Sequence, residues 1–204
     1  HYSLLGIKPF DKRVTIGGRL FTKKPPYYIY NRFENQLLLS AHHVACEKNI
    51  KDYLDEIIKF KPKFIQGHPS AVFVMANYIN ENNYQFNHQL NGIFTTGESL
   101  SENDQKYIEN AFGTKLLQQY GSGESIISAI QLPENRNYAV DFERGFIELE
   151  HNEKTGMDEI IGTSFLNESF CFLRYKMNDF AEASKEKSQK GLPVVIENII
   201  GRTD

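Results

Sequence analysis

The sequence predicts an α/β protein in which a parallel sheet flanked by helices is followed by a β-rich, antiparallel part. Strand-like and helix-like segments alternate from about residue 37 to residue 120, which is typical of a parallel sheet with helices packed on it. After residue 125, short apolar or alternating segments follow one another between turns, which is typical of antiparallel strands. The chain has 204 residues, 40% of them hydrophobic, so it can form a substantial core.

The first strand and helix of the alternating region lie between residues 37 and 62. The run LLLSAHHV, which starts at Leu37, has the length of a strand. Ile50, Leu54 and Ile57 then recur at helical spacing until Lys61-Pro62, where the proline disfavours a continued helix.

The second pair begins with a short strand, residues 64–66, which Gly67-His68 interrupts. Pro69 is well placed to open the next helix, because its missing N–H would have no partner inside the helix. This helix is expected to continue to Ile79.

The third pair consists of the apolar strand LNGIF, the polar turn TTGESLS and the helix ENDQKYIENAFG. Ser101 is the expected N-cap, Asp104 approximates a capping box three residues later, and Gly113 is expected to end the helix. A fourth strand, TKLLQQY, leads into GSGE. The loops 67–70, 96–101 and 121–124 therefore all follow parallel strands, at the sheet edge where ligands of such folds bind.

The second half is expected to form an antiparallel sheet or partial barrel. Its predicted strands are SIISAIQL, YAVDF, GFIELEHN, EIIGTSF, FCFLRY and VVIENIIG. The polar stretch 181–193 is expected to be a mobile surface loop. By this division, residues 1–32 are a connecting segment, 33–124 an α/β subdomain, 125–200 a β-rich subdomain, and 201–204 follow the last strand.

Charge and cysteine content exclude several classes of protein. Residues 1–70 hold 12 Lys and Arg against 6 Asp and Glu, but these cations are spaced singly, so a solvated face or an anionic small ligand is favoured over nucleic acid. Cys46 and Cys171 lack metal-site or disulfide-framework spacing and are expected to be free thiols. With no apolar run of membrane-spanning length and no signal-peptide pattern, a cytoplasmic protein without a membrane span is expected.

Four residues near the strand ends are candidates for binding. GSGE at 121–124 lacks the GxxxxGK[ST] spacing of a phosphate-binding P-loop. A Tyr120 ring can stack on adenine and Glu98 or Glu124 can bind Mg²⁺, although a core aromatic and surface charges are the alternative interpretations. Asp179 can accept the two hydroxyls of a ribose, or it is a turn residue closing a strand.

The histidines His42, His43 and His68 have no acidic residue at ligand spacing, which argues against a catalytic dyad or metal site.

Taken in order, FIQGHPSAV, TTGESL, YGSGE, LRYKMND and IIGRTD resemble motifs of the adenylate-forming acid-CoA ligases. The resemblance covers about residues 30–204 and is strongest to the phenylacetate-CoA ligase-like branch, which includes capsular polysaccharide biosynthesis proteins. It implies that a carboxylic acid attacks the α-phosphate of ATP to give an acyl adenylate, and that a thiol, usually coenzyme A, takes the acyl group. The chain then resembles a central fragment of the large N-terminal domain of such an enzyme.

The resemblance also implies roles for individual residues. Tyr120 would pack on adenine, the Gly97-Glu98 backbone would line the adenine pocket and Asp179 would bind the ribose hydroxyls. Catalytic roles are implied for Glu124, which would hold Mg²⁺, and for Arg202, which would reach the nucleotide from an interdomain hinge. The remaining implied positions are Gly121 at the nucleotide and His68, Pro69 and Ser70 beside the acyl group. Residues 201–204 would form the hinge to a missing C-terminal domain, with Asp204 as the hinge residue.

The sequence departs from the family pattern at several points. Gly123 stands where the usual YGxTE motif has Thr, so a hydroxyl that would meet phosphate is missing. The Ser/Thr/Gly-rich phosphate loop, the C-terminal domain with its catalytic Lys, and the zinc-binding Cys and His of some relatives are not found. We therefore expect missing N- and C-terminal parts of the same protein as partners, and no turnover by this piece alone. The alternative hypothesis is a non-catalytic homologue that acts as a binding protein in capsular polysaccharide biosynthesis.

Overall fold

The computed structural model describes residues 2–18, 24–167, 169–184 and 195–202. They divide into two compact units, His1–Leu117 (unit 1) and Gln118–Asp204 (unit 2). The division falls inside strand β6 (Leu116–Gly121), whereas the sequence predicted a boundary after residue 124. None of the helices in these described ranges is long and apolar enough to cross a membrane.

Unit 1 is built on a mostly parallel sheet. Strand β1 pairs in parallel with β3 and with β4, and β4 pairs in parallel with β5, while β2 is antiparallel to β3. In spatial order the strands are β2 (Tyr28–Asn31), β3 (Gln36–Ser40), β1 (Arg13–Gly17), β4 (Phe64–Gly67) and β5 (Gly92–Thr96). Two short 3₁₀ helices, η1 (Tyr2–Leu5) and η2 (Ala41–His43), flank these strands.

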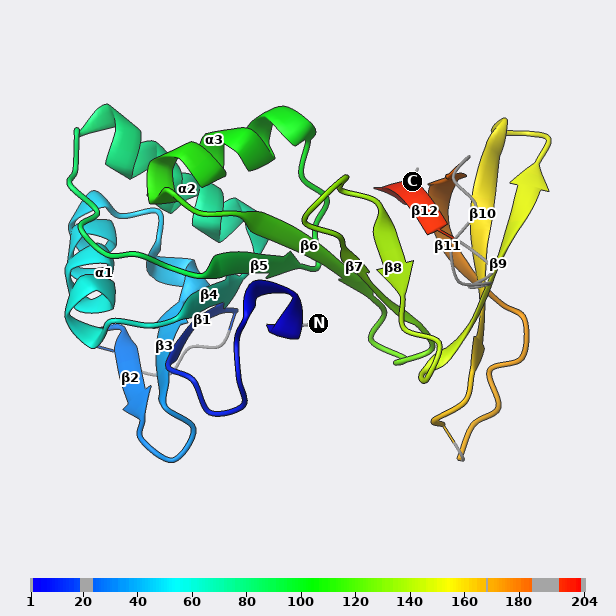
Figure 1. Ribbon diagram of the computed structural model, residues 1–204, viewed down its shortest axis with the longest axis horizontal. Helices are drawn as coiled ribbons and strands as arrows, with labels where there is room; N and C mark the ends of the chain where they lie inside the picture. The colour runs from blue at the N-terminus through cyan, green and yellow to red at the C-terminus, as the bar shows by residue number, and fades with distance from the viewer. Residues whose placement is uncertain (1, 19–23, 168, 185–194, 203–204) are drawn as a thin grey trace. The chain divides into compact units, whose positions relative to one another are not determined.

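Three helices cover one face of this sheet: α1 (Glu47–Phe60), α2 (Pro69–Glu81) and α3 (Glu102–Phe112) (Figure 1). Alternate strand residues such as Val14, Leu37 and Ile65 pack with Leu54 of α1 and Met75 of α2 in one buried cluster, and each of these five side chains is fully buried. The core of unit 1 therefore lies between the helices and the sheet, as the alternating sequence pattern predicted.

The helix ends confirm the predicted capping. Helix α1 ends at Phe60, and the C-cap residue Lys61 adopts a left-handed conformation (φ 54°) directly before Pro62. In α3 the Ser101 hydroxyl accepts the backbone N–H of Asp104 at 3.1 Å, and Gly113 follows the helix with φ 63°. Pro69 occupies the first turn of α2.

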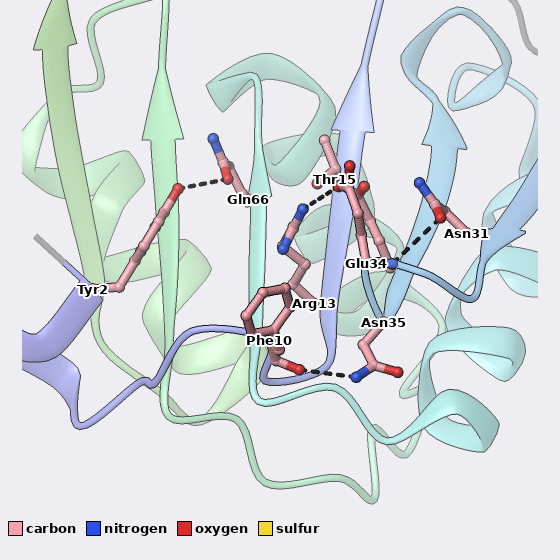
Figure 2. A network of polar contacts seen from close by, with 9 residues as sticks. Tyr2, Phe10, Arg13, Thr15, Asn31, Glu34, Asn35 and Gln66 are labelled. Carbon is pink, nitrogen blue, oxygen red and sulfur yellow. Dashed lines mark hydrogen bonds and ion pairs between the residues drawn. The ribbon is translucent and has the colours of Figure 1, made fainter.

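The opposite face of the unit 1 sheet carries polar side chains, which Figure 2 shows. Tyr2 donates its hydroxyl to Gln66 at 2.9 Å and packs against the rings of Phe64 and Phe94. Arg13 pairs with Glu34 at 2.5 Å (Figure 2). Because strand residues alternate between faces, this polar face and the apolar helix-covered face come from the same short strands.

Unit 2 is an antiparallel sheet that starts with the end of β6. Its core contains Ile126, Ile147, Ile160, Met177 and Ile196. The strands after β6 follow in the spatial order β7 (Ser128–Gln131), β8 (Tyr138–Val140), β12 (Val195–Gly201), β11 (Tyr175–Ala183), β10 (Met157–Ser164) and β9 (Gly145–Asn152). The described pairs in this series are antiparallel, as predicted.

Residues 1–32 are more than the expected connecting segment, because they contribute β1 and β2. Strand β1 lies between β3 and β4 in the sheet. Only Val14 and Ile16 of this strand are buried, so its apolar alternation is too short to stand out among neighbouring Gly, Pro and Lys residues.

Two predictions in the second half were wrong. Phe170–Arg174 do not form the strand predicted from FCFLRY; Phe170 and Leu173 are exposed, and Arg174 (φ 46°) pairs with Glu148 at 3.1 Å outside any strand. The strand instead begins at Tyr175 and continues to Ala183, so Asp179 lies inside it and residues 181–183 are not loop. Residues 185–193 of the predicted loop lie outside the described residues.

Candidate functional site

The loop after β4 leads directly into helix α2. His68 occupies the N-cap position with extended backbone angles, and its side chain makes no capping hydrogen bond. Pro69 is buried in the first helical turn, while Ser70 is exposed beside it. An uncapped first turn leaves backbone N–H groups available to an acceptor from elsewhere.

Glu98 supplies that acceptor from the loop after β5. One carboxylate oxygen of Glu98 accepts the backbone N–H of Ser70 at 2.9 Å, and the other accepts the Ser70 hydroxyl at 3.0 Å. A negative charge at a helix N-terminus is favourable because the free N–H groups there carry partial positive charge. The two loops that were predicted to lie at one edge of the sheet are thus joined within unit 1.

Gly97 lies close to the loop that leads into α2. Its φ of 90° is unfavourable for residues with a side chain, and a Cβ atom at this position would lie 3.4 Å from Nδ1 of His68. The predicted acyl-side residues His68, Pro69 and Ser70 and the predicted adenine-side residues Gly97 and Glu98 therefore form one group. Their roles toward a substrate stay predictions.

A second group of predicted residues comes together in unit 2. The Tyr120 hydroxyl at the end of β6 donates to Oδ2 of Asp179 in β11 at 2.7 Å. Nε of Arg202, directly after β12, lies 3.8 Å from the other oxygen, Oδ1. The Asp179 side chain is 16% exposed and that of Arg202 is 67% exposed, so the carboxylate is partly shielded while the cation reaches solvent.

Burial raises the pKa of Tyr120 far above its ordinary value, and the hydrogen bond to the Asp179 carboxylate raises this pKa further. At neutral pH the phenol therefore keeps its proton and acts as a hydrogen-bond donor. The ring is half-buried and packs beside the apolar core of unit 2. This arrangement offers an aromatic face, a carboxylate and a guanidinium within one unit.

Gly121, Gly123 and Glu124 lie at the end of β6 and in the turn that follows. A Cβ atom on Gly123 would meet nothing within 4 Å, so this position has room for the Thr of the family pattern. Glu124 is exposed. In the described part of the chain, no three His, Cys, Asp or Glu side chains are grouped as a metal site. A single carboxylate suffices chemically for Mg²⁺ when phosphate oxygens and water supply the other ligands.

Other predicted positions lie apart from these groups. Asp204 lies outside the described residues. His42 contacts the backbone carbonyl of Gly18 at 2.7 Å, and His43 stacks on Tyr27. Cys46 and Cys171 are free thiols, as predicted.

Sequence reasoning missed a cavity of about 830 Å³ on the polar face of unit 1. It lies toward the amino ends of β1, β3 and β4, and none of the predicted site residues lines it. The lining includes Tyr2, Arg13, Glu34, Gln36, Phe64 and Gln66. Ligands of parallel α/β sheets bind at the opposite, carboxyl edge, and no motif marks this place in the sequence.

No protein-family model matches the chain. Among curated proteins, Protein CapK from Staphylococcus aureus is 32% identical over 215 residues, which covers 98% of this chain and 45% of CapK. Among solved structures, 2-hydroxyisobutyryl-CoA ligase in complex with 2-HIB-AMP and CoA matches with a TM-score of 0.64 at 15% identity, covering 98% of this chain and 46% of that one. Anthranilate CoA ligase AuaEII in complex with anthranoyl-AMP matches with a TM-score of 0.58 at 13% identity, covering 94% and 40%.

The chain has the fold of the adenylate-forming CoA ligases. The predicted fold class and the resemblance read from the five motifs are thereby confirmed. The chain spans less than half the length of these relatives. The motifs fall in the adenylate-forming fold as two groups, one at the α2 N-terminus of unit 1 and one around Asp179 in unit 2.

Proposed function

We propose that the whole protein activates a carboxylic acid with ATP as an acyl adenylate and transfers the acyl group to a thiol, that of coenzyme A. The observation that carries this proposal is the contact of Tyr120, Asp179 and Arg202, which come from three motifs far apart in the sequence. Their chemistry matches the nucleoside half of a nucleotide. The relatives solved with an acyl-AMP, one of them with CoA, support the same reaction class.

In this proposal unit 2 binds the nucleoside. The Tyr120 ring packs on adenine, and the Asp179 carboxylate accepts the ribose hydroxyls, because a carboxylate has several acceptor sites and no donor. Gly121 lets the backbone approach the nucleotide.

The phosphates and the acid require compensation of charge, because both are anions. Glu124 would hold Mg²⁺, which supplies positive charge that offsets this repulsion when it is bound. Arg202 is exposed and carries a guanidinium suited to phosphate or ribose oxygens. The carboxylate of Glu124 and the guanidinium of Arg202 are chemical groups of the types that these roles require.

The acid is assigned to the loop His68–Ser70. A carboxylate oxygen of the acid forms a bond to the α-phosphorus of ATP, the bond to pyrophosphate breaks, and pyrophosphate leaves. The sulfur of the thiol then bonds to the acyl carbon, the bond to AMP breaks, and the thiol loses its proton. Positioning accounts for most of the acceleration in such a two-step transfer. The Glu98 carboxylate already occupies the N-terminus of α2, so the acid's own carboxylate is not drawn to that helix end.

Pyrophosphate release by the whole protein tests this proposal. Release is expected to require ATP, Mg²⁺ and a suitable carboxylic acid from a broad panel, and Asp179→Ala is expected to lower it by about 100-fold or more, the scale of losing a substrate-positioning group. Asp158→Ala is the matched control, since among the described residues Asp158 of β10 pairs with exposed His151. No release with any acid would contradict the proposal.

The second candidate is a non-catalytic relative that acts as a binding protein in surface or capsular polysaccharide biosynthesis. Gly123 is the observation that favours it, because the family's hydroxyl is missing there. Space around Gly123 accommodates the substitution Gly123→Thr. This candidate is supported if the unaltered protein releases no pyrophosphate and the Gly123→Thr variant does. Pyrophosphate release by the unaltered protein excludes it.

A further inference from the structure

The hydrogen bond between Tyr120 and Asp179 joins two strands that are not neighbours. The residues are 59 positions apart in sequence, and β7, β8 and β12 separate β6 from β11 in the strand order. In a flat sheet, four inter-strand steps would place β6 and β11 about 19 Å apart. A bond of 2.7 Å therefore requires the sheet of unit 2 to curl strongly, and it fixes two distant motifs to each other.

The bond involves the hydroxyl of Tyr120, not its ring face. The hydroxyl engages Oδ2 of Asp179, while Arg202 lies near Oδ1 at the longer distance of 3.8 Å. A carboxylate has about four acceptor sites, so one donated bond leaves sites free on both oxygens. The phenol thus sets the position and rotation of the carboxylate without blocking it.

We propose that the Tyr120 hydroxyl is the positioning group that orients Asp179 toward both ribose hydroxyls, and that it thereby sets the preference of the site for ribonucleotides over deoxyribonucleotides. This inference rests on the proposed nucleotide site of unit 2. It separates two functions of one side chain: the ring contributes to binding of the base, and the hydroxyl contributes to recognition of the sugar through Asp179.

The geometry favours separate roles for the ring and the hydroxyl of Tyr120. Asp179 lies at the hydroxyl edge of the Tyr120 ring, so an adenine stacked on the ring face with its ribose directed past that edge would bring the ribose to the carboxylate. The raised pKa of Tyr120 keeps the proton on its hydroxyl, which therefore donates to Oδ2 of Asp179 and occupies one acceptor site of the carboxylate; the other acceptor sites stay open to the ribose hydroxyls, which are also donors.

The test compares binding of AMP, 2′-deoxy-AMP and 3′-deoxy-AMP to the whole protein by calorimetry. The unaltered protein is expected to bind AMP more tightly than either deoxy analogue. Tyr120→Phe keeps the ring, and it is expected to weaken AMP binding about tenfold, the scale of one net hydrogen bond, while changing the binding of at least one deoxy analogue by less than about twofold. Tyr138→Phe, which removes a buried phenol from β8 of the same unit, should leave the preference unchanged.

Asp179→Asn supplies a second arm that does not depend on Tyr120→Phe alone. If the hydroxyl acts through Asp179, adding Tyr120→Phe to Asp179→Asn causes no further loss of ribose preference, whereas an additive loss overturns the inference. An equal loss for AMP and both deoxy analogues in Tyr120→Phe also overturns it, because that result indicates a role in base binding or folding. If AMP binds and Tyr120→Phe keeps the full preference, only the inference fails; if the unaltered protein binds no AMP, the nucleotide site fails with it.

Discussion

In unit 1 the candidate residues lie at the ends of strands and helices and are held by backbone groups, whereas in unit 2 side chains from β6, β11 and the end of β12 contact one another. Glu98 binds the backbone of Ser70, and Gly97 is defined by its φ angle. Tyr120, Asp179 and Arg202 instead form a side-chain network. The difference indicates that the candidate residues of unit 1 are positioned by helix α2 and its core. Those of unit 2 are positioned by contacts between their own functional groups.

The largest expected effect concerns the core that supports α2, the helix whose N-terminus carries His68–Ser70. Met75 is fully buried between this helix and the sheet. Met75→Ala should lower the free energy of unfolding by about 3 kcal/mol, through lost burial and the cavity left behind. Chemical denaturation measures this.

Val74, the preceding residue of the same helix, is the matched control because its side chain is 37% exposed. Val74→Ala should change the free energy of unfolding by less than about 0.5 kcal/mol. Equal effects of the two substitutions would contradict the assignment of α2 to the core of unit 1.

A smaller effect is expected at the helix end itself. Glu98→Ala removes the acceptor of two Ser70 hydrogen bonds and should lower the free energy of unfolding by about 1 kcal/mol, the usual cost of losing an N-terminal cap. Glu81→Ala changes the same residue type at the other end of α2 and should cost less than about 0.5 kcal/mol, because an acidic side chain there does not complement the helix dipole. An equal loss of unfolding free energy in the two variants would contradict the conclusion that Glu98 joins the two loops.

The smallest effect concerns an exposed cluster on α1. A hydrogen bond from Lys51 and then one from Tyr84 lower the pKa of Asp55 below its ordinary value of 3.8. A lowered pKa in the folded state means that this contribution to stability is present above about pH 4 and is lost as the pH falls through the folded pKa.

Asp55→Asn should therefore reduce stability slightly at pH 7, and this deficit should shrink as the pH falls through the lowered pKa of Asp55. Unfolding curves of both proteins across this range measure the difference. A deficit that persists unchanged at the lowest pH would show that the ionised carboxylate is not responsible. Because Lys51 and Asp55 are both about half exposed, this effect should be smaller than that of Glu98→Ala.

The fold was largely predictable because its signals are local. Helical spacing in α1, Pro69 at the start of α2 and Ser101 at the start of α3 all reflect physics within a few residues. Strand β1 was missed because its neighbours in the sheet, not its composition, make it a strand. The strand predicted from FCFLRY failed because an apolar, aromatic run is equally compatible with an exposed loop.

The candidate site was predictable only in part. Strand-end loops could be located from the alternation of elements, and the identities of Tyr120 and Asp179 as binding residues came from family motifs. The contact between these two side chains depends on the curl of a whole sheet, which no local pattern encodes. The bond from Ser70 to Glu98 had no local signal, because Glu98 lies 28 residues after Ser70 and only tertiary packing brings it to the start of α2.

The most direct test of the central claim, that unit 2 holds a nucleoside site, is a calorimetric titration of the whole protein with AMP. We predict saturable binding by the unaltered protein and a loss of about 100-fold or more in the double variant Tyr120→Ala, Asp179→Ala, which removes both the stacking face and the ribose acceptor. Unchanged AMP affinity in the double variant, at preserved folding, would contradict the claim.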